Sequence, residues 1–162
     1  GRIGGRVAEI GKGFGADVRY WSQNRKKHLE KRDIKYQDAD KLIAQADIIS
    51  LHFAETPDTI QFLNKRRIKS MEKGALIVTT VPNEIIDFAA LEERLKKGEI
   101  TFISDHADEL DKKTAKRLSK YKNCIFYPSI GFISSEARIA KQEIFIDNMS
   151  GFLNGKSQNV VS

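Results

Sequence analysis

The residues Gly1-Arg2-Ile3-Gly4 form the first stretch whose types and spacing could do chemistry, and they run directly into the helical pattern of residues 5–10. A glycine-rich turn that opens a helix presents backbone N–H groups and the positive end of the helix dipole to a phosphate. In the dinucleotide fingerprint G-x-G-x-x-G, Gly1 and Gly4 would be the second and third glycines. The alternative is an ordinary helix start.

A second group of polar residues, Ser22, Arg25 and Lys26, follows the β-rich run 17–21. In a dinucleotide fold, an acidic side chain at this point accepts hydrogen bonds from the ribose of NAD and repels the 2′-phosphate of NADP. No Asp or Glu directly follows the run here, and a hydroxyl with two cations could hold a phosphate by charge-assisted hydrogen bonds. The loop therefore tilts the prediction towards NADP, with a solvated basic loop as the alternative.

Two histidines and the single cysteine lie within or directly after apolar runs. His52 closes the run 47–52, and no second ligand is placed to join it, so we expect a packed or hydrogen-bonded histidine and no metal site. His106 follows the run 100–105, whose carboxyl end would face a cofactor crevice; the alternative is a solvated or capping histidine. Cys124 lies in the apolar run 124–127, which favours a buried structural thiol.

Length and composition favour one globular domain over residues 1–162. There is neither an apolar run long enough to span a membrane nor a signal peptide, and one cysteine suits a reducing cytoplasm. The net charge of +6 invites nucleic acid as a partner. Because the basic residues are spread over separate segments without an aromatic ladder, we do not expect nucleic-acid binding.

Apolar periodicity and capping residues predict an alternation of helices and strands. Strands are expected over residues 17–21, 47–52, 75–80, 100–105 and 124–127. Helices are expected over 5–10, ending in the glycine-rich 11–15, over 38–46, from 56–59, and over 64–73, 88–97, 112–122 and a long segment capped by Ser134. Short strands that are apolar on both faces and alternate with helices indicate an α/β fold with a doubly wound parallel sheet in three α/β/α layers.

At this point the chain resembles the dinucleotide-binding domain of the D-isomer-specific 2-hydroxyacid dehydrogenases, over nearly all of its length. The order and spacing of several stretches carry the resemblance together: 1–4, 46–52, 56–59, 63–64, 71–75, 87, 90–91, 128–131 and 152–155. The resemblance implies a Rossmann-type domain whose first strand is missing from this chain. It further implies a smaller substrate domain, built from residues before and after these, that is not present in it.

The resemblance also implies a homodimer through this domain and a site for NAD or NADP. The cofactor-binding positions that it implies are Gly1, Arg2, Ile3, Gly4, Ser22, Arg25, Lys26, His52, Thr56, Thr80, Val81, Asp105, Ser129 and Gly131.

Members of that family need an Arg to hold the substrate carboxylate, a His to move a proton and an acidic partner for the His. The gapless match puts Pro82 in the place of the Arg and Ser129 in the place of the His. Proline has no donor, and a serine carries no proton at neutral pH. The acidic position falls on Leu110, although the stretch is one residue short, so Glu109 or Asp108 could fill it. Two other histidines, His106 and His28, are possible substitutes.

Three hypotheses remain: an oxidoreductase that uses non-standard groups, a protein that binds a dinucleotide without turnover, and an interaction module with neither ligand nor reaction. The family label implies hydride transfer between a nicotinamide cofactor and a 2-hydroxy or 2-keto acid. The residues favour dinucleotide binding with little or no standard activity, because two of the three catalytic positions are substituted.

Overall fold

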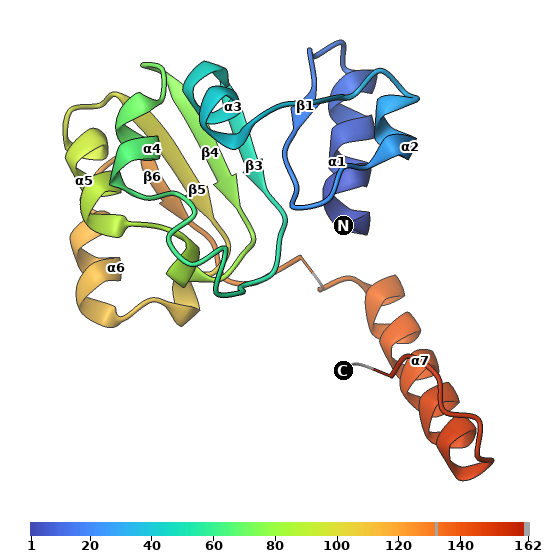
Figure 1. Cartoon of the computed structure of the whole chain (residues 1–162). Coiled ribbons are helices and arrows are strands. Elements are labelled where there is room, and N and C mark those ends of the chain that lie inside the picture. The colour runs from blue at the N-terminus through green and yellow to red at the C-terminus, as the bar shows by residue number, and fades with distance from the viewer. Residues whose placement is uncertain (132, 161–162) are drawn as a thin grey trace. The chain divides into compact units, whose positions relative to one another are not determined.

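The computed structural model describes residues 1–131 and 133–160, which fall into two compact units, Gly1–Pro128 and Ser129–Ser162. Helices and strands alternate along the first unit, as the sequence predicts, and the second unit is built on one long helix (Figure 1). Within the described part of the chain, none of the helices combines the length and hydropathy that crossing a bilayer requires.

The N-terminal part of the first unit is a helix with a small parallel sheet. Its elements are α1 (Arg2–Gly13), β1 (Arg19–Tyr20), α2 (Lys27–Glu30) and β2 (Lys35–Tyr36), and β1 pairs with β2 in parallel. Helix α1 continues through Gly11, where the sequence had suggested its end, and Gly15 turns the chain with a φ of +85°. Neither α2 nor β2 was predicted from the sequence, because both are short and mostly polar.

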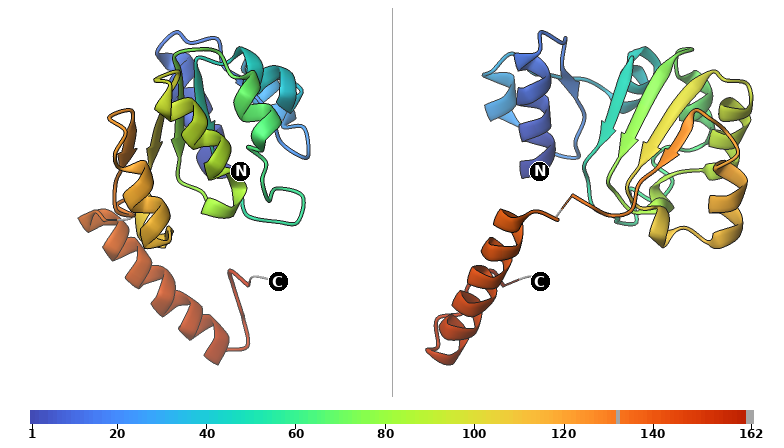
Figure 2. Two further views of the ribbon diagram at one scale, coloured as in Figure 1. Left: turned by 90° about the vertical axis from the view of Figure 1, so that its left-hand side faces the viewer. Right: turned by 180° about the vertical axis from the view of Figure 1, so that it is seen from behind.

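The rest of the first unit contains a four-stranded parallel sheet. Strands β3 (Ile48–Leu51), β4 (Ala75–Thr79), β5 (Ile100–Ser104) and β6 (Cys124–Phe126) lie side by side in that order. Helices α3 (Ala39–Gln45), α4 (Lys65–Ser70) and α5 (Phe88–Lys96) pack over one face, and Figure 2 shows the strands from the other side. Helix α6 (Lys112–Leu118) and two 3-10 turns, η1 (Asn83–Ile85) and η2 (Ala107–Glu109), complete the unit.

The main core lies between this sheet and its helices. Ile77 and Phe102, at the centre of β4 and β5, are fully buried against Leu91 of α5 and its neighbours. Strand side chains that point to the other face of the sheet are more exposed to solvent. Ile48 is 65% exposed and Ile125 is 38% exposed. The sequence had suggested strands buried on both faces, whereas the helices α3, α4 and α5 of this unit cover one face only.

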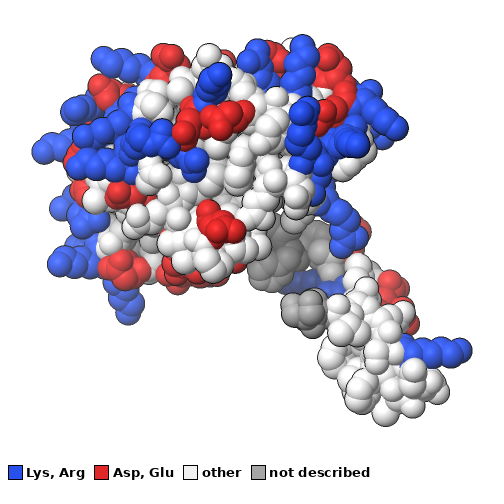
Figure 3. All heavy atoms as spheres, viewed as in Figure 1, with Lys and Arg blue, Asp and Glu red and all other residues white. Residues whose placement is uncertain are grey.

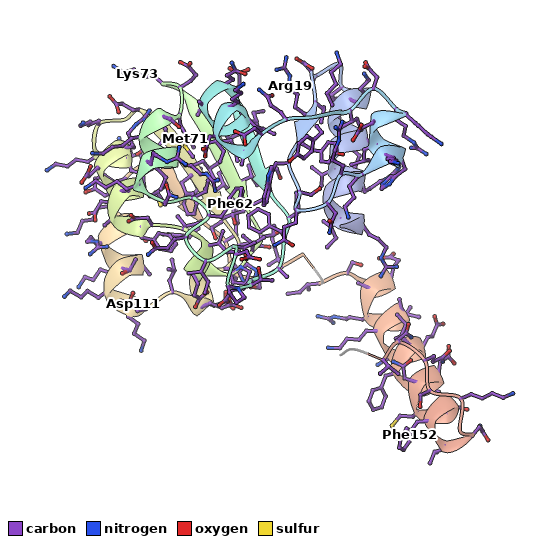
Figure 4. The ribbon with its side chains drawn as sticks, viewed as in Figure 1. Arg19, Phe62, Met71, Lys73, Asp111 and Phe152 are labelled. Atoms are coloured by element: carbon purple, nitrogen blue, oxygen red, sulfur yellow. The ribbon has the colours of Figure 1, made fainter. Side chains whose placement is uncertain are left out.

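The strands form two sheets instead of one. No strand precedes α1 in the described residues, and β1–β2 is not hydrogen-bonded to β3–β6. This is the Rossmann-type α/β arrangement without its first strand that the sequence predicted. Aromatic rings pack between the end of β1 and the loop after β3. The ring of Phe62, which is labelled in Figure 4, has its centroid 4.6 Å from that of Trp21 and 4.8 Å from that of Phe53.

Side chains at the helix starts explain most of the confirmed boundaries. Each of five N-cap residues accepts a hydrogen bond from a backbone N–H in the first turn of its helix: Asp38, Asn64, Asp87, Asp111 and Ser134. The helix expected from Thr56 was wrong. The buried Thr59 hydroxyl accepts from the Thr56 N–H at 2.7 Å and donates to the Ala54 carbonyl at 2.9 Å, and these bonds hold a series of turns.

Helix α6 is shorter than predicted and ends at Leu118, where the Ser119 hydroxyl donates to the Ala115 carbonyl. The second unit contains the long helix α7 (Ser135–Leu153), which is followed by a turn. Large apolar residues of α7 are between 49% and 77% exposed: Ile139, Ile144, Phe145, Ile146, Met149, Phe152 and Leu153.

Candidate functional site

The first turn of α1 forms the phosphate end of the candidate site, defined here as residues 1–4 with His52. Gly1 is the N-cap, makes no side-chain bond to the helix, and would carry a Cβ into open space. The first intrahelical bond runs from the Gly5 N–H to the Gly1 carbonyl, so the N–H groups of Arg2, Ile3 and Gly4 precede the helical ladder. Such amides, at the positive end of a twelve-residue helix, suit an anion.

His52 lies against this turn at the carboxyl end of β3. A Cβ on Gly4 would lie 3.0 Å from the Cβ of His52, so only glycine lets the helix approach this closely. The Nε2 atom of His52 lies 2.8 Å from the Ser50 hydroxyl, and burial lowers the pKa of His52, which favours the neutral ring. Its Nδ1 atom is buried and has no hydrogen-bond partner among the described residues. Together with the uncapped amides, this atom fits a polar, anionic ligand such as a dinucleotide.

The carboxyl ends of β4 and β5 form the second part of the candidate site, called the strand-end edge here and defined as Thr80, Val81, Pro82, Asp105, His106 and Glu109. His106 Nε2 lies 3.2 Å from the Thr80 carbonyl, and its Nδ1 lies 3.1 Å from a Glu109 carboxylate oxygen. The contact of Nδ1 with Glu109 is within ion-pair distance but is not a hydrogen bond, whereas Nε2 is within hydrogen-bond distance of the Thr80 carbonyl. Asn83 adds a bond from its side-chain amide to the His106 carbonyl at 3.2 Å.

Asp105 lies beside this pair, with a carboxylate oxygen 3.8 Å from His106 Nε2. Val81 is buried, and its N–H donates to the Thr79 hydroxyl. The structure therefore brings Thr80, Val81, Asp105, His106 and Glu109 together at one edge of the sheet, as expected for the ends of neighbouring parallel strands.

The remaining predicted positions lie at the 3-10 turns of this edge, in the second unit or on α2. Pro82 precedes the η1 turn as its N-cap, and Leu110 follows the η2 turn. Ser129 and Gly131 belong to the second unit. His28 is exposed on α2, in the N-terminal part of the first unit.

The segment 22–26 after β1, called the ribose loop here, makes several bonds within the chain. The Ser22 hydroxyl donates to the Asn24 carbonyl at 2.6 Å. The Arg25 guanidinium makes a two-pronged bond to Glu30, from Nε to Oε1 at 3.0 Å and from NH2 to Oε2 at 2.8 Å. Lys26 donates its backbone N–H to the Tyr20 hydroxyl at 2.6 Å, and no ion pair of its side chain is found among the described residues.

Glu30 and Tyr20, which bond to residues of this loop, were not predicted from the sequence. Tyr20 lies on β1 and donates its hydroxyl to Glu30 Oε1 at 2.9 Å. Glu30 is five positions after Arg25, on the short α2 helix that the sequence did not reveal. An acidic residue at this distance from a predicted phosphate-binding arginine was the available signal.

Basic side chains elsewhere are mixed with acidic ones. On the face seen in Figure 3, Lys and Arg lie mainly around the rim of the first unit, with Asp and Glu among them. Arg66 and Arg67, for example, both bond to Asp40.

Comparison with known proteins places these features in a family. The family model for the D-isomer specific 2-hydroxyacid dehydrogenase, NAD binding domain, matches residues 1–131. A glyoxylate reductase of Aeropyrum pernix is 33% identical over 158 residues, which cover 96% of this chain and 47% of that protein. A hydroxypyruvate reductase of Blautia hydrogenotrophica is 29% identical, covering 100% of this chain and 51% of the relative.

Solved structures agree with the family match. A D-lactate dehydrogenase from Lactobacillus jensenii, determined with NAD+, matches with a TM-score of 0.88 and 28% identity over 100% of this chain and 53% of its own. The apo D-lactate dehydrogenase of Escherichia coli matches with a TM-score of 0.85 and 27% identity over 97% of this chain and 50% of its own. The chain spans about half the length of these relatives. It belongs to the D-isomer-specific 2-hydroxyacid dehydrogenase family, and residues 1–131 correspond to the NAD-binding domain.

Proposed function

We propose that this chain binds NAD or NADP, with the diphosphate at the N-terminus of α1 and the adenosine ribose at the ribose loop. The observation that carries the proposal is the phosphate end: uncapped amides, an approach to His52 that leaves no room for a Cβ, and a buried His52 Nδ1 atom without a protein partner among the described residues. All 162 residues would then serve a dinucleotide-binding domain, with the substrate domain outside this chain.

The second part of the proposal is that standard 2-hydroxyacid dehydrogenase activity is weak or absent. When bound, a nicotinamide supplies or accepts the hydride, and protein groups must hold the substrate carboxylate and move a proton. Pro82 has no hydrogen-bond donor for the substrate carboxylate, and the Ser129 hydroxyl does not serve as a proton donor or acceptor in acid–base catalysis at neutral pH. His106 is the nearby imidazole, but both of its ring nitrogens already face the Thr80 carbonyl and Glu109.

The proposal also covers the preferred cofactor, the oligomeric state and the cellular location. NADP is favoured over NAD because Arg25 and Lys26 occupy the ribose loop. A homodimer is favoured because α7 exposes large apolar side chains, including Phe145 and Phe152. A cytoplasmic location follows from the absence of any disulfide partner for the single Cys124 in this chain. A purely non-catalytic sensing or dimerisation module is the second candidate, and the same exposed helix supports it.

Calorimetric titration of the full-length protein with NAD+, NADH, NADP+ and NADPH tests the first part. Micromolar binding of any of these cofactors supports it, and no heat with any of them would favour the module without a ligand. Reduction of glyoxylate, hydroxypyruvate and pyruvate, the substrates suggested by the names of the relatives, tests the second part. Turnover at an ordinary enzymatic rate, about 1–10³ s⁻¹, would overturn it.

A gain-of-function variant tests the catalytic reasoning directly. Pro82→Arg combined with Ser129→His restores a cation and an imidazole at the positions that the family match assigns to them. Restoring the acid–base group alone should raise kcat/KM by about 10²-fold or more. Pro82→Arg combined with Ser129→Gln is the matched control, because glutamine has a side chain of similar size that cannot move a proton.

A further inference from the structure

Arg25 of the ribose loop forms a two-pronged ion pair with Glu30 of α2 that the proposed function does not use. Glu30 occupies the Nε and NH2 donors of Arg25, accepts from the Tyr20 hydroxyl, and has a side chain only 28% exposed, against 63% for that of Arg25. The guanidinium carbon of Arg25 also lies 5.1 Å from the centre of the Tyr36 ring. Arg25 is therefore fixed by a carboxylate on one edge and by an aromatic face.

The position of the Arg25–Glu30 pair suggests that it could affect binding of the 2′-phosphate of NADP. Ser22 follows Gly1 at about the 20-residue spacing at which dinucleotide folds place the group that meets the adenosine ribose. A 2′-phosphate arriving there would meet Arg25 with its best two-pronged edge already bonded to Glu30. It would also meet the negative charge of Glu30, whose pKa is held below its usual range by the hydrogen bonds from Arg25 and then Tyr20.

We propose that Glu30 is a specificity-determining residue that restrains NADP binding by occupying the Arg25 guanidinium. The inference rests on the proposed function, because it assumes that the ribose loop meets the cofactor. Glu30 competes with the 2′-phosphate for the same cation and leaves binding of NAD, which lacks that phosphate, unaffected. The domain consequently accepts both cofactors with a smaller preference for NADP than Arg25 and Lys26 would otherwise give.

The opposite role for Glu30 is to hold Arg25 in the orientation that a phosphate needs. The two roles differ in sign. An orienting carboxylate would help the 2′-phosphate, because immobilising an arginine beforehand lowers the entropic cost of binding. A competing carboxylate opposes it through charge. Since the phosphate carries nearly two negative charges and Glu30 takes two donors of the only guanidinium in the loop, competition is the larger effect.

Binding of 5′-AMP and 2′,5′-ADP to the full-length protein tests the proposal without any turnover, because these probes differ only in the 2′-phosphate. In Glu30→Gln, the amide can still accept from Arg25 and Tyr20, but the charge is gone. We expect the affinity ratio of 2′,5′-ADP to 5′-AMP to rise about threefold to fivefold, the upper part of the range of about 1.4-fold to fivefold for an exposed ion pair. Glu30→Ala should raise it too, whereas Arg25→Gln should lower it below the wild-type value.

Glu9→Gln is the matched control. Glu9 is also partly exposed, at 24%, and pairs with Arg6 and Arg32 in the same part of the unit, so it removes the same charge without touching Arg25. A ratio unchanged in Glu30→Gln, or lowered in Glu30→Ala, would overturn the inference while leaving dinucleotide binding in place. Failure of the wild-type protein to bind either probe would overturn the proposed function and this inference with it.

Discussion

A methyl group added at Gly4 should weaken dinucleotide binding, whereas one added at the next residue should not. In Gly4→Ala the new Cβ would lie 3.0 Å from the Cβ of His52, well inside the usual contact distance of about 3.5–4.0 Å between carbon atoms. The Cβ of His52 cannot rotate away, because it is fixed to the backbone of the chain. The first turn of α1 must therefore move relative to the end of β3.

The cost follows from the hydrogen bonds at the phosphate end. A hydrogen bond from a backbone amide to a charged group contributes about 1.5–3 kcal/mol. Weakening one such bond by about 1 kcal/mol corresponds to about fivefold weaker binding of NAD+ or NADP+. Calorimetric titration of the full-length protein measures this change, and the effect should be equal for both cofactors because both carry the diphosphate.

Gly5→Ala is the matched control on the same turn. Its Cβ would lie 3.7 Å from a methyl carbon of Leu29, an ordinary contact, and alanine in place of glycine should stabilise the helix by about 0.5–1 kcal/mol. Wild-type affinity in Gly4→Ala, or an equal loss in both variants, would refute the assignment of residues 1–4 to the diphosphate.

Three further predictions concern groups away from the phosphate end. Arg94→Met should lower the free energy of unfolding, measured in urea, by about 2–4 kcal/mol. The buried guanidinium of Arg94 donates to the Ile68 and Met71 carbonyls and pairs with Glu99 at 2.7 Å. A loss below about 0.5 kcal/mol would contradict this prediction. Hydrogen bonds from Arg67, and then Arg66, lower the folded-state pKa of Asp40, so its stabilising effect is present above the unfolded-state pKa of about 3.9 and is lost as the pH falls through the folded value. The stability difference between the wild-type protein and Asp40→Asn should accordingly shrink between about pH 5 and pH 2, and a difference that is constant with pH would count against the pair. Burial raises the pKa of Cys124 to about 11, so its thiol should react with a disulfide reagent at pH 8 far more slowly in the folded protein than in urea, and equal rates would show that it is accessible.

The fold could be predicted from the sequence mainly where apolar residues set the pattern. The runs around Ile49, Ile77 and Phe102 were recognised as strands, and N-cap residues such as Asp87 and Ser134 gave the starts of their helices. Prediction failed where side-chain bonds replace the periodic pattern. Thr59 turns the segment after Thr56 away from a helix through its hydroxyl, and no apolar spacing reveals such bonds.

Individual residues of the candidate site were predicted from the sequence, but the side-chain contacts between them were not. His106 was placed at the end of its strand, as found, but its contacts with the Thr80 carbonyl and Glu109 depend on two strands and a 3-10 turn meeting in space. Arg25 was predicted as a cation for the ribose loop, and its pairing with Glu30 was not, because α2 has too few apolar residues to be recognised. Contacts between segments are therefore the information that the sequence did not provide.

The two ends of the candidate site depend on different elements, and this separation makes binding without turnover physically reasonable. The phosphate end rests on the backbone of α1 and the packing of Gly4 against His52, neither of which involves the segment around Pro82. A proline after β4 removes a possible side-chain donor but leaves the amides of α1 unchanged. Substitution at the strand-end edge can therefore remove groups that hydride transfer would need while the proposed affinity for the diphosphate is retained, whereas the Gly4→Ala variant should lower affinity without altering any residue of the strand-end edge.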